Sequence, residues 1–170
     1  MKNLLYARTP HGPRRKAGSL LAALALAGLA AGTVWAAATI RGSGTCAGTL
    51  TLTPLSGSHM AVEINVAGNI MHLGKSKITL HSVADFSTSP PSPVPPTTGI
   101  VTAANGDLIK FTLKWTPTPL APGVFVFTGP FTIVEGTGRF LGAGGGGEYR
   151  GVIDLVTGEV IATISGEVTR

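Results

Sequence analysis

The chain has 170 residues, of which 24 are glycine and 12 are proline, and only 12% are charged. Its formal net charge is +5 and its mean hydropathy is +0.35. This composition excludes a disordered charged tail, a coiled coil and a large multidomain enzyme, because each needs more charge or more length. It predicts one small domain together with an apolar segment.

The first 38 residues have the order of a secretory signal helix. A basic stretch with Arg14 and Arg15 precedes an apolar run over 17–34, and small residues end at Ala38. We therefore predict a signal peptide over 1–38, cleaved after Ala38, and a secreted or periplasmic domain over 39–170. An uncleaved N-terminal membrane anchor is the alternative, since about 18 apolar residues approach the length that spans a bilayer. The arginine pair leaves the Sec and twin-arginine export routes both open.

The domain that follows residue 38 is electrically neutral, with eight cationic and eight anionic side chains. Nucleic-acid binding relies on clustered Lys and Arg side chains, so the sequence predicts no nucleic-acid partner. The spacing of His59, His72 and His81 matches no zinc motif, so we predict no metal site. Cys46 is the single cysteine, which excludes an intrachain disulfide. We predict that Cys46 is a small buried apolar residue.

Apolar residues after residue 38 recur with a period of two, which is typical of half-buried strands. Asn105-Gly106 favours a tight hairpin turn, and residues 135–138 form another turn. Pro-rich residues 116–123 are expected to break the sheet, and Gly129-Pro130 is expected to bend it. About eight short strands without a capped helix predict a closed antiparallel barrel or a compact sandwich. The expected strands cover 49–53, 61–66, 77–82, 99–104, 107–116, 124–128, 131–134, 144–155 and 159–169.

Residues 87–98 contain five prolines among serines and threonines. Proline lacks the backbone N–H group that a sheet ladder needs, so this segment is expected to be a loop. Fewer than 60 residues separate it from the predicted cleavage site, too few for a comfortable core. We therefore interpret it as a Pro-rich loop at 87–98 inside one domain.

Two short motifs stand out, residues 131–143, FTIVEGTGRFLGA, and Ala104-Asn105-Gly106-Asp107 upstream. They resemble motifs of dirigent proteins and allene oxide cyclase-like barrels, especially of small exported bacterial members. Glu135 departs from the pattern, because dirigent proteins usually have glycine there. The resemblance covers roughly 99–168 and implies an eight-stranded, calycin-like barrel, often a homo-oligomer, with a cavity for an apolar small molecule. The catalytic positions of the plant families do not map onto this chain.

The aromatic residues of the predicted strands are the candidates for ligand binding. Phe111 and Trp115 alternate with polar residues after the hairpin, and Phe125 and Phe127 lie in the next strand, which is expected to be buried on one or both faces. In a barrel such positions face the interior. Trp115 is expected at the cavity mouth.

The catalytic candidates are weaker and comprise Tyr149, Glu148 and His81. His81 points outward if Ile78 and Leu80 face an apolar core, and inward if the interior is polar. Residues 142–147 spell G-x-G-x-x-G, but a strand pattern follows where a nucleotide site needs a helix. We therefore predict no cofactor.

Three functions remain open at this point. The first is an exported barrel that binds or orients an apolar or aromatic small molecule through aromatic burial and one or two polar groups. The second is a cofactor-free cyclase or isomerase of the allene oxide cyclase type, in which a buried ionisable group stabilises charge. The third is an envelope structural or interaction protein without a ligand.

Overall fold

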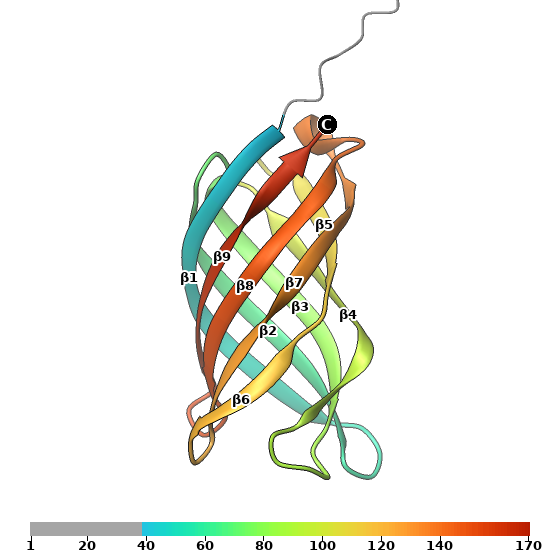
Figure 1. Cartoon of the computed structure of the whole chain (residues 1–170), viewed down its shortest axis with the longest axis vertical. Coiled ribbons are helices and arrows are strands. Elements are labelled where there is room, and N and C mark those ends of the chain that lie inside the picture. The colour runs from blue at the N-terminus through green and yellow to red at the C-terminus, as the bar shows by residue number, and fades with distance from the viewer. Residues whose placement is uncertain (1–38) are drawn as a thin grey trace, which may run out of the picture. The chain divides into compact units, whose positions relative to one another are not determined.

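The computed structural model describes residues Thr39–Arg170, and the predicted signal peptide or anchor at 1–38 lies outside them. The described chain is a closed antiparallel β-barrel, as the period of two predicted (Figure 1). Within Thr39–Arg170, no helix is long and apolar enough to cross a membrane. The elements are β1 (Thr39–Pro54), β2 (His59–Ile70), β3 (Gly74–Asp85), β4 (Ser92–Thr102), β5 (Leu108–Leu113), β6 (Thr116–Ala121), β7 (Val124–Gly136), the 3₁₀ turn η1 (Gly138–Phe140), β8 (Gly144–Asp154) and β9 (Glu159–Thr169).

Eight strand positions make up the barrel because β5 and β6 share one position. The hydrogen-bonded order is β5-β4-β3-β2-β1-β9-β8-β7-β6, and a further β5–β7 ladder closes the sheet on itself. Leu113 of β5 pairs with Phe131 of β7, and Thr116 of β6 pairs with Thr128 of the same strand. The barrel with eight strand positions expected from the sequence is therefore confirmed.

Two proline-containing segments differ from their predicted loop and break. The expected loop at 87–98 is wrong for Ser92–Thr98, which belong to β4, and the expected break after Thr116 is strand β6. The first half of β4 pairs with β3, while β6 pairs with β7, and the described ladders include none between β4 and β6. A strand edge without a ladder requires no N–H donor, so proline is tolerated there.

Strand β7 passes through the predicted bend at Gly129-Pro130 without a break. Gly129 pairs with Tyr149 and Pro130 pairs with Glu148 in the regular β7–β8 register. Proline is again accommodated because its missing donor falls on one side of the strand only. The irregularity of β7 lies instead opposite Lys110 and Phe111 of β5.

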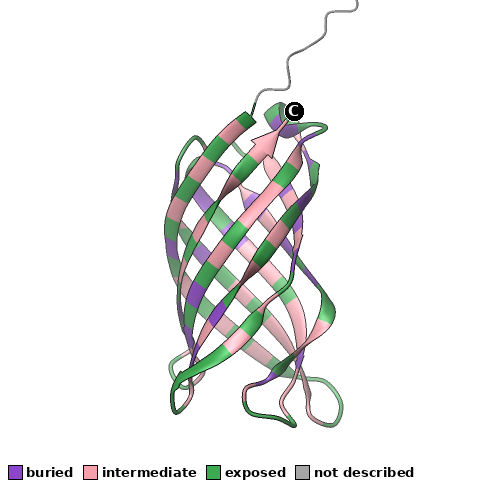
Figure 2. Cartoon of the chain, in the orientation of Figure 1, coloured by how far each residue is buried: buried purple, intermediate pink, exposed green. Residues whose placement is uncertain are grey.

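Alternation along most strands separates an apolar interior from a more polar exterior, as the striped burial pattern of Figure 2 shows. On β3, for example, Ile78 is buried whereas Lys77 is exposed. The buried core residues come from all barrel positions, and Cys46 is among them with 2% exposure, as predicted. The interior is therefore lined by apolar side chains, and the volume that these side chains leave empty determines whether a ligand fits inside the barrel.

The two motifs that carry the family resemblance meet at one end of the barrel. The Asp107 carboxylate accepts a hydrogen bond from the Arg139 backbone N–H at 3.1 Å. Leu108 and Thr137 exchange two more, from Leu108 N–H to the Thr137 hydroxyl and from Thr137 N–H to the Leu108 carbonyl, each 2.9 Å. Gly138 has φ +55°, and a side chain there would collide with Asp107. The hairpin turn and η1 thus form one unit that closes this end over the buried Phe140.

Candidate ligand-binding cavity

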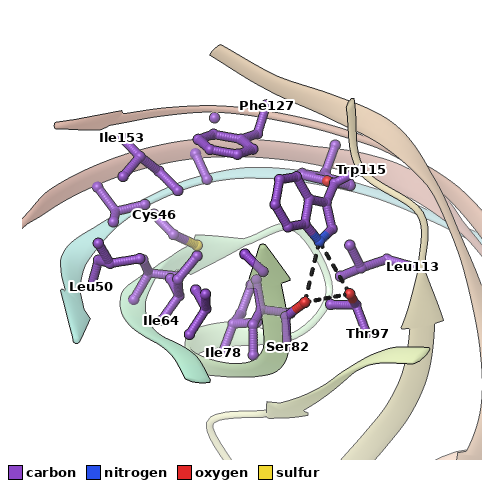
Figure 3. A pocket seen from close by; sticks show the side chains of 18 of the residues that line it. Cys46, Leu50, Ile64, Ile78, Ser82, Thr97, Leu113, Trp115, Phe127 and Ile153 are labelled. Carbon is purple, nitrogen blue, oxygen red and sulfur yellow. Dashed lines mark hydrogen bonds between the residues drawn. The ribbon is translucent and has the colours of Figure 1, made fainter. Parts of the chain in front are cut away.

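The barrel encloses an apolar cavity of about 100 Å³. Side chains from both halves of the chain line it, including Leu50, Ile64, Ile78, Leu113 and Ile153 (Figure 3). Phe86 and Pro91, from the loop between β3 and β4, line it as well. The Pro-rich segment therefore contributes to the cavity wall through its loop part.

A second apolar cavity of about 60 Å³ lies in the half of the barrel that contains η1. Ile40, Ile70 and Val168 line it, and Phe111 and Phe131 line both cavities. These two rings meet edge-on, with centroids 5.6 Å apart. Phe111 and Phe131 therefore form part of the wall between two chambers.

Aromatic rings also shape the larger cavity. Trp115 and Phe127 meet edge-on with ring centroids 5.0 Å apart, and both line the cavity. Trp115 lies between the end of β5 and the start of β6. Such rings offer π faces and edges to an aromatic ligand at little cost in side-chain entropy.

A small polar cluster lies in the cavity wall beside Trp115. The indole N–H of Trp115 lies 3.1 Å from Thr97 Oγ1 and 3.3 Å from Ser82 Oγ, and the two hydroxyls are 2.7 Å apart (Figure 3). Ser82 is also within reach of the Val83 carbonyl at 3.3 Å. The members of this cluster satisfy one another, so it anchors the indole rather than offering a free donor to a ligand.

Tyr149 contributes a phenolic group to the cavity wall. Its hydroxyl is buried, and no residue of the described chain accepts or donates a hydrogen bond to it. Burial, with a smaller contribution from the negative charge of Glu148, raises the pKa of Tyr149 well above its ordinary value. The phenol is therefore neutral and has an unused donor and acceptor.

The remaining ionisable group of the wall is the Cys46 thiol. Burial raises the pKa of Cys46, so the protonated thiol predominates at neutral pH. Among the described residues that line the cavity there is no Asp, Glu, His, Lys or Arg. The wall therefore carries no formal charge at neutral pH.

The structure brings four of the seven sequence candidates to the cavity. Phe111, Trp115, Phe127 and Tyr149 line it. Phe125 is buried beside Phe127, with ring centroids 6.3 Å apart, but is not part of the cavity wall.

The other two candidates point away from the interior. His81 faces outward, with its Nδ1 3.9 Å from a Glu63 carboxylate oxygen. Glu148 is exposed on the outer face of β8, since its neighbour Tyr149 takes the inward position. Neither side chain is placed for chemistry inside the barrel.

Sequence reasoning missed the polar cluster of Ser82 and Thr97. Ser82 continues the inward alternation of Ile78 and Leu80, which is a signal the sequence contains. Thr97 lies in the Pro-rich segment, for which the sequence predicts a loop. Its meeting with Trp115 depends on the β4–β5 register, in which Thr97 pairs with Leu113.

Comparisons of the chain with models of protein families, with curated proteins and with solved structures give no match. The geometry of the cavity is therefore the basis for a functional conclusion.

Proposed function

We propose that the barrel binds a small, uncharged, apolar or aromatic molecule in its interior. The observation that supports this is the cavity of about 100 Å³, whose wall is almost wholly hydrocarbon. Engineered apolar cavities of roughly 150 Å³ stay dry and bind benzene. A ligand about the size of a single aromatic ring is on this scale.

The alternatives are less well supported by the same wall. A cyclase or isomerase needs a group that stabilises developing charge, and the ionisable groups of the wall are a neutral thiol and a neutral phenol. A purely structural barrel gains stability by filling its interior, because empty volume lacks packing contacts. We therefore favour a binding protein over both.

We further propose that the domain acts outside the cytoplasm and resembles the dirigent and allene oxide cyclase-like barrels in handling an apolar ligand. The order of residues in 1–38 supports export, and the joined motifs at Asp107 and Thr137 support the resemblance. Expression of the full chain in bacteria, followed by fractionation and N-terminal sequencing, tests the export proposal. An N-terminus at Thr39 in the exported fraction is expected; retention of residues 1–38 in the membrane fraction would support the anchor instead.

Tryptophan fluorescence offers a direct test of binding. The chain has two tryptophans, Trp35 and Trp115, so the Trp35→Phe variant of the full chain reports from the cavity wall alone. Titration with toluene or indene should change the Trp115 emission saturably and raise the melting temperature. Absence of both effects for a panel of such hydrocarbons would contradict the proposal.

A matched pair of substitutions provides the control. Ala162 lines the cavity and pairs with Cys46 across the β1–β9 ladder, whereas Ala47, the next residue of β1, is exposed on the outer face. Ala162→Leu should fill the cavity and abolish binding, while Ala47→Leu should leave binding unchanged. Circular dichroism verifies that both variants fold, since overpacking costs about 1–3 kcal/mol.

A further inference from the structure

The buried hydroxyl of Tyr149 narrows the class of ligand, and this inference rests on the proposed function. A hydroxyl taken out of water without a hydrogen-bond partner is costly, so such groups are rare in folded proteins. Among the described residues, Tyr149 Oη is the buried side-chain polar atom without a partner. It belongs to a side chain that lines the cavity.

The polar groups beside it do not compete for the same role. The Trp115 N–H is already shared between Thr97 and Ser82, and those two hydroxyls bond to each other. The thiol of Cys46 is a weak donor. Tyr149 is therefore the strong hydrogen-bond donor of the cavity wall that has no partner in the described chain.

Glycines adjoin Tyr149 on β8 and β7, whereas its partner on β9 is Ile164. Its inward neighbours along β8 are Gly147 and Gly151, and its partner on β7 is Gly129. A side chain at Gly129 would collide with the backbone of Lys114, and one at Gly147 with the backbone of β9. The glycines are thus required by close strand packing, and they leave the phenol isolated in the apolar wall.

We propose that Tyr149 donates its hydroxyl proton in a hydrogen bond to a neutral acceptor on the bound molecule, such as a ketone, ester or ether oxygen. The apolar remainder of the ligand then packs against hydrocarbon and the rings of Trp115 and Phe127. A carboxylate ligand is disfavoured, because the described wall offers no cation to compensate its desolvation. A pure hydrocarbon binds but leaves the phenol without a partner.

An isosteric ligand pair tests this inference. Acetophenone and α-methylstyrene have the same shape and differ by a carbonyl oxygen in place of a methylene group. Against the full chain, Tyr149→Phe should weaken acetophenone about threefold to tenfold relative to α-methylstyrene, which is the range for loss of one neutral hydrogen bond. The infrared carbonyl band of bound acetophenone should lie at lower frequency in the wild-type protein than in Tyr149→Phe. Benzoate should bind to neither protein.

Each result has a distinct meaning. If neither isostere binds to the wild-type chain, the proposed function fails. If both bind but Tyr149→Phe changes neither their affinity ratio nor the carbonyl band, the proposed function stands and the role of Tyr149 is overturned. Thr51→Val is the matched control, because Thr51 is exposed on β1 and does not line the cavity, so removal of its hydroxyl should leave both affinities unchanged. Ser82→Ala tests the cluster of Ser82, Thr97 and Trp115, and loss of discrimination in that variant alone would assign the donor to the cluster and overturn the inference.

Discussion

Phe111 and Phe131 meet edge-on with ring centroids 5.6 Å apart, and this contact lies between the two chambers of the barrel. Phe111 is 4% exposed and occupies the space that the absent side chain of Gly99, its partner on β4, leaves open. We therefore expect the pair to limit the length of a ligand that binds in the larger chamber.

Truncation of Phe111 should join the chambers. Phe111→Ala is expected to lower the free energy of unfolding by about 3–5 kcal/mol, since it removes a buried ring and enlarges an internal void. Phe111→Leu is the milder variant for binding work. In urea titrations and fluorescence binding assays, both variants should lose stability and accept longer ligands such as n-butylbenzene. A folded variant with an unchanged size limit would show that Phe111 does not separate the chambers.

Trp115 should stabilise the barrel through its indole N–H as well as its ring. Trp115→Phe keeps an aromatic ring but removes the donor to Thr97 and Ser82, so the expected loss is about 1 kcal/mol beyond the change in packing. A double-mutant cycle with Thr97→Val isolates this contribution, because contacting residues are not additive. Urea denaturation followed by circular dichroism measures it. Strict additivity of the two substitutions would contradict a coupled hydrogen bond.

The fold is predictable from the sequence because the period of two is a local signal. The prolines, in contrast, lead to the wrong prediction of a loop and a break. Alternation in β1, β2, β5 and β9 identified strands and their inward faces. The sequence predicts a loop at Pro93 and a break at Pro117. Each proline lies instead in a strand that pairs with a neighbouring strand on one side at the position of the proline. Which edge of a strand lacks a partner depends on the whole sheet, and the sequence of one strand does not contain it.

Of the cavity wall, the sequence predicts the aromatic residues but not the polar cluster of Ser82 and Thr97. The parity of β8 requires that Tyr149 and Glu148 face opposite sides, and Tyr149 takes the inner one because burial of an unpaired carboxylate costs more than burial of a phenol. Ser82 lies on β3, Thr97 on β4 and Trp115 between β5 and β6, and up to 33 residues of the chain separate them. Their cluster follows from strand register, which no spacing rule along the sequence specifies.

Cys46 should be nearly inert in the folded protein. It is 2% exposed, so a reagent rarely reaches its sulfur. Burial also raises the pKa of its thiol, so little of the reactive thiolate is present. Alkylation by iodoacetamide at pH 8 should be at least about tenfold slower in buffer than in urea. Because Cys46 is the single cysteine, mass spectrometry of the intact chain reports this site alone. A bound ligand should slow the reaction further, and equal rates in both states would refute a buried thiol.

Acid should weaken the fold through Asp85 at the end of β3. Its carboxylate accepts hydrogen bonds from the Ser58 hydroxyl and the Ser87 backbone N–H, which lower its pKa to about 2. A folded-state pKa below the ordinary 3.8 means that the stabilisation is complete above about pH 4 and is lost as the pH falls toward 2.

The comparison of Asp85→Asn with the wild-type chain tests this dependence. The urea midpoint of the wild-type chain should fall between pH 5 and pH 2, and that of Asp85→Asn should fall less. Ser58→Ala should reduce the dependence as well, because the Ser58 hydroxyl is the largest cause of the lowered pKa. Identical pH profiles for all three proteins would show that these hydrogen bonds do not form in solution.

Tyr149→Phe should have the opposite effect on stability from the other core substitutions. It removes a buried hydroxyl that has no partner in the described chain and leaves the ring in place, so the ligand-free protein should gain about 1 kcal/mol in the free energy of unfolding. Urea denaturation of the ligand-free wild type and variant measures this gain. A group that costs stability in the empty protein yet improves affinity for a carbonyl ligand has the signature of a binding residue. A loss of stability in Tyr149→Phe would mean that the hydroxyl has a partner in the folded protein, and the phenol would then belong to the structural core.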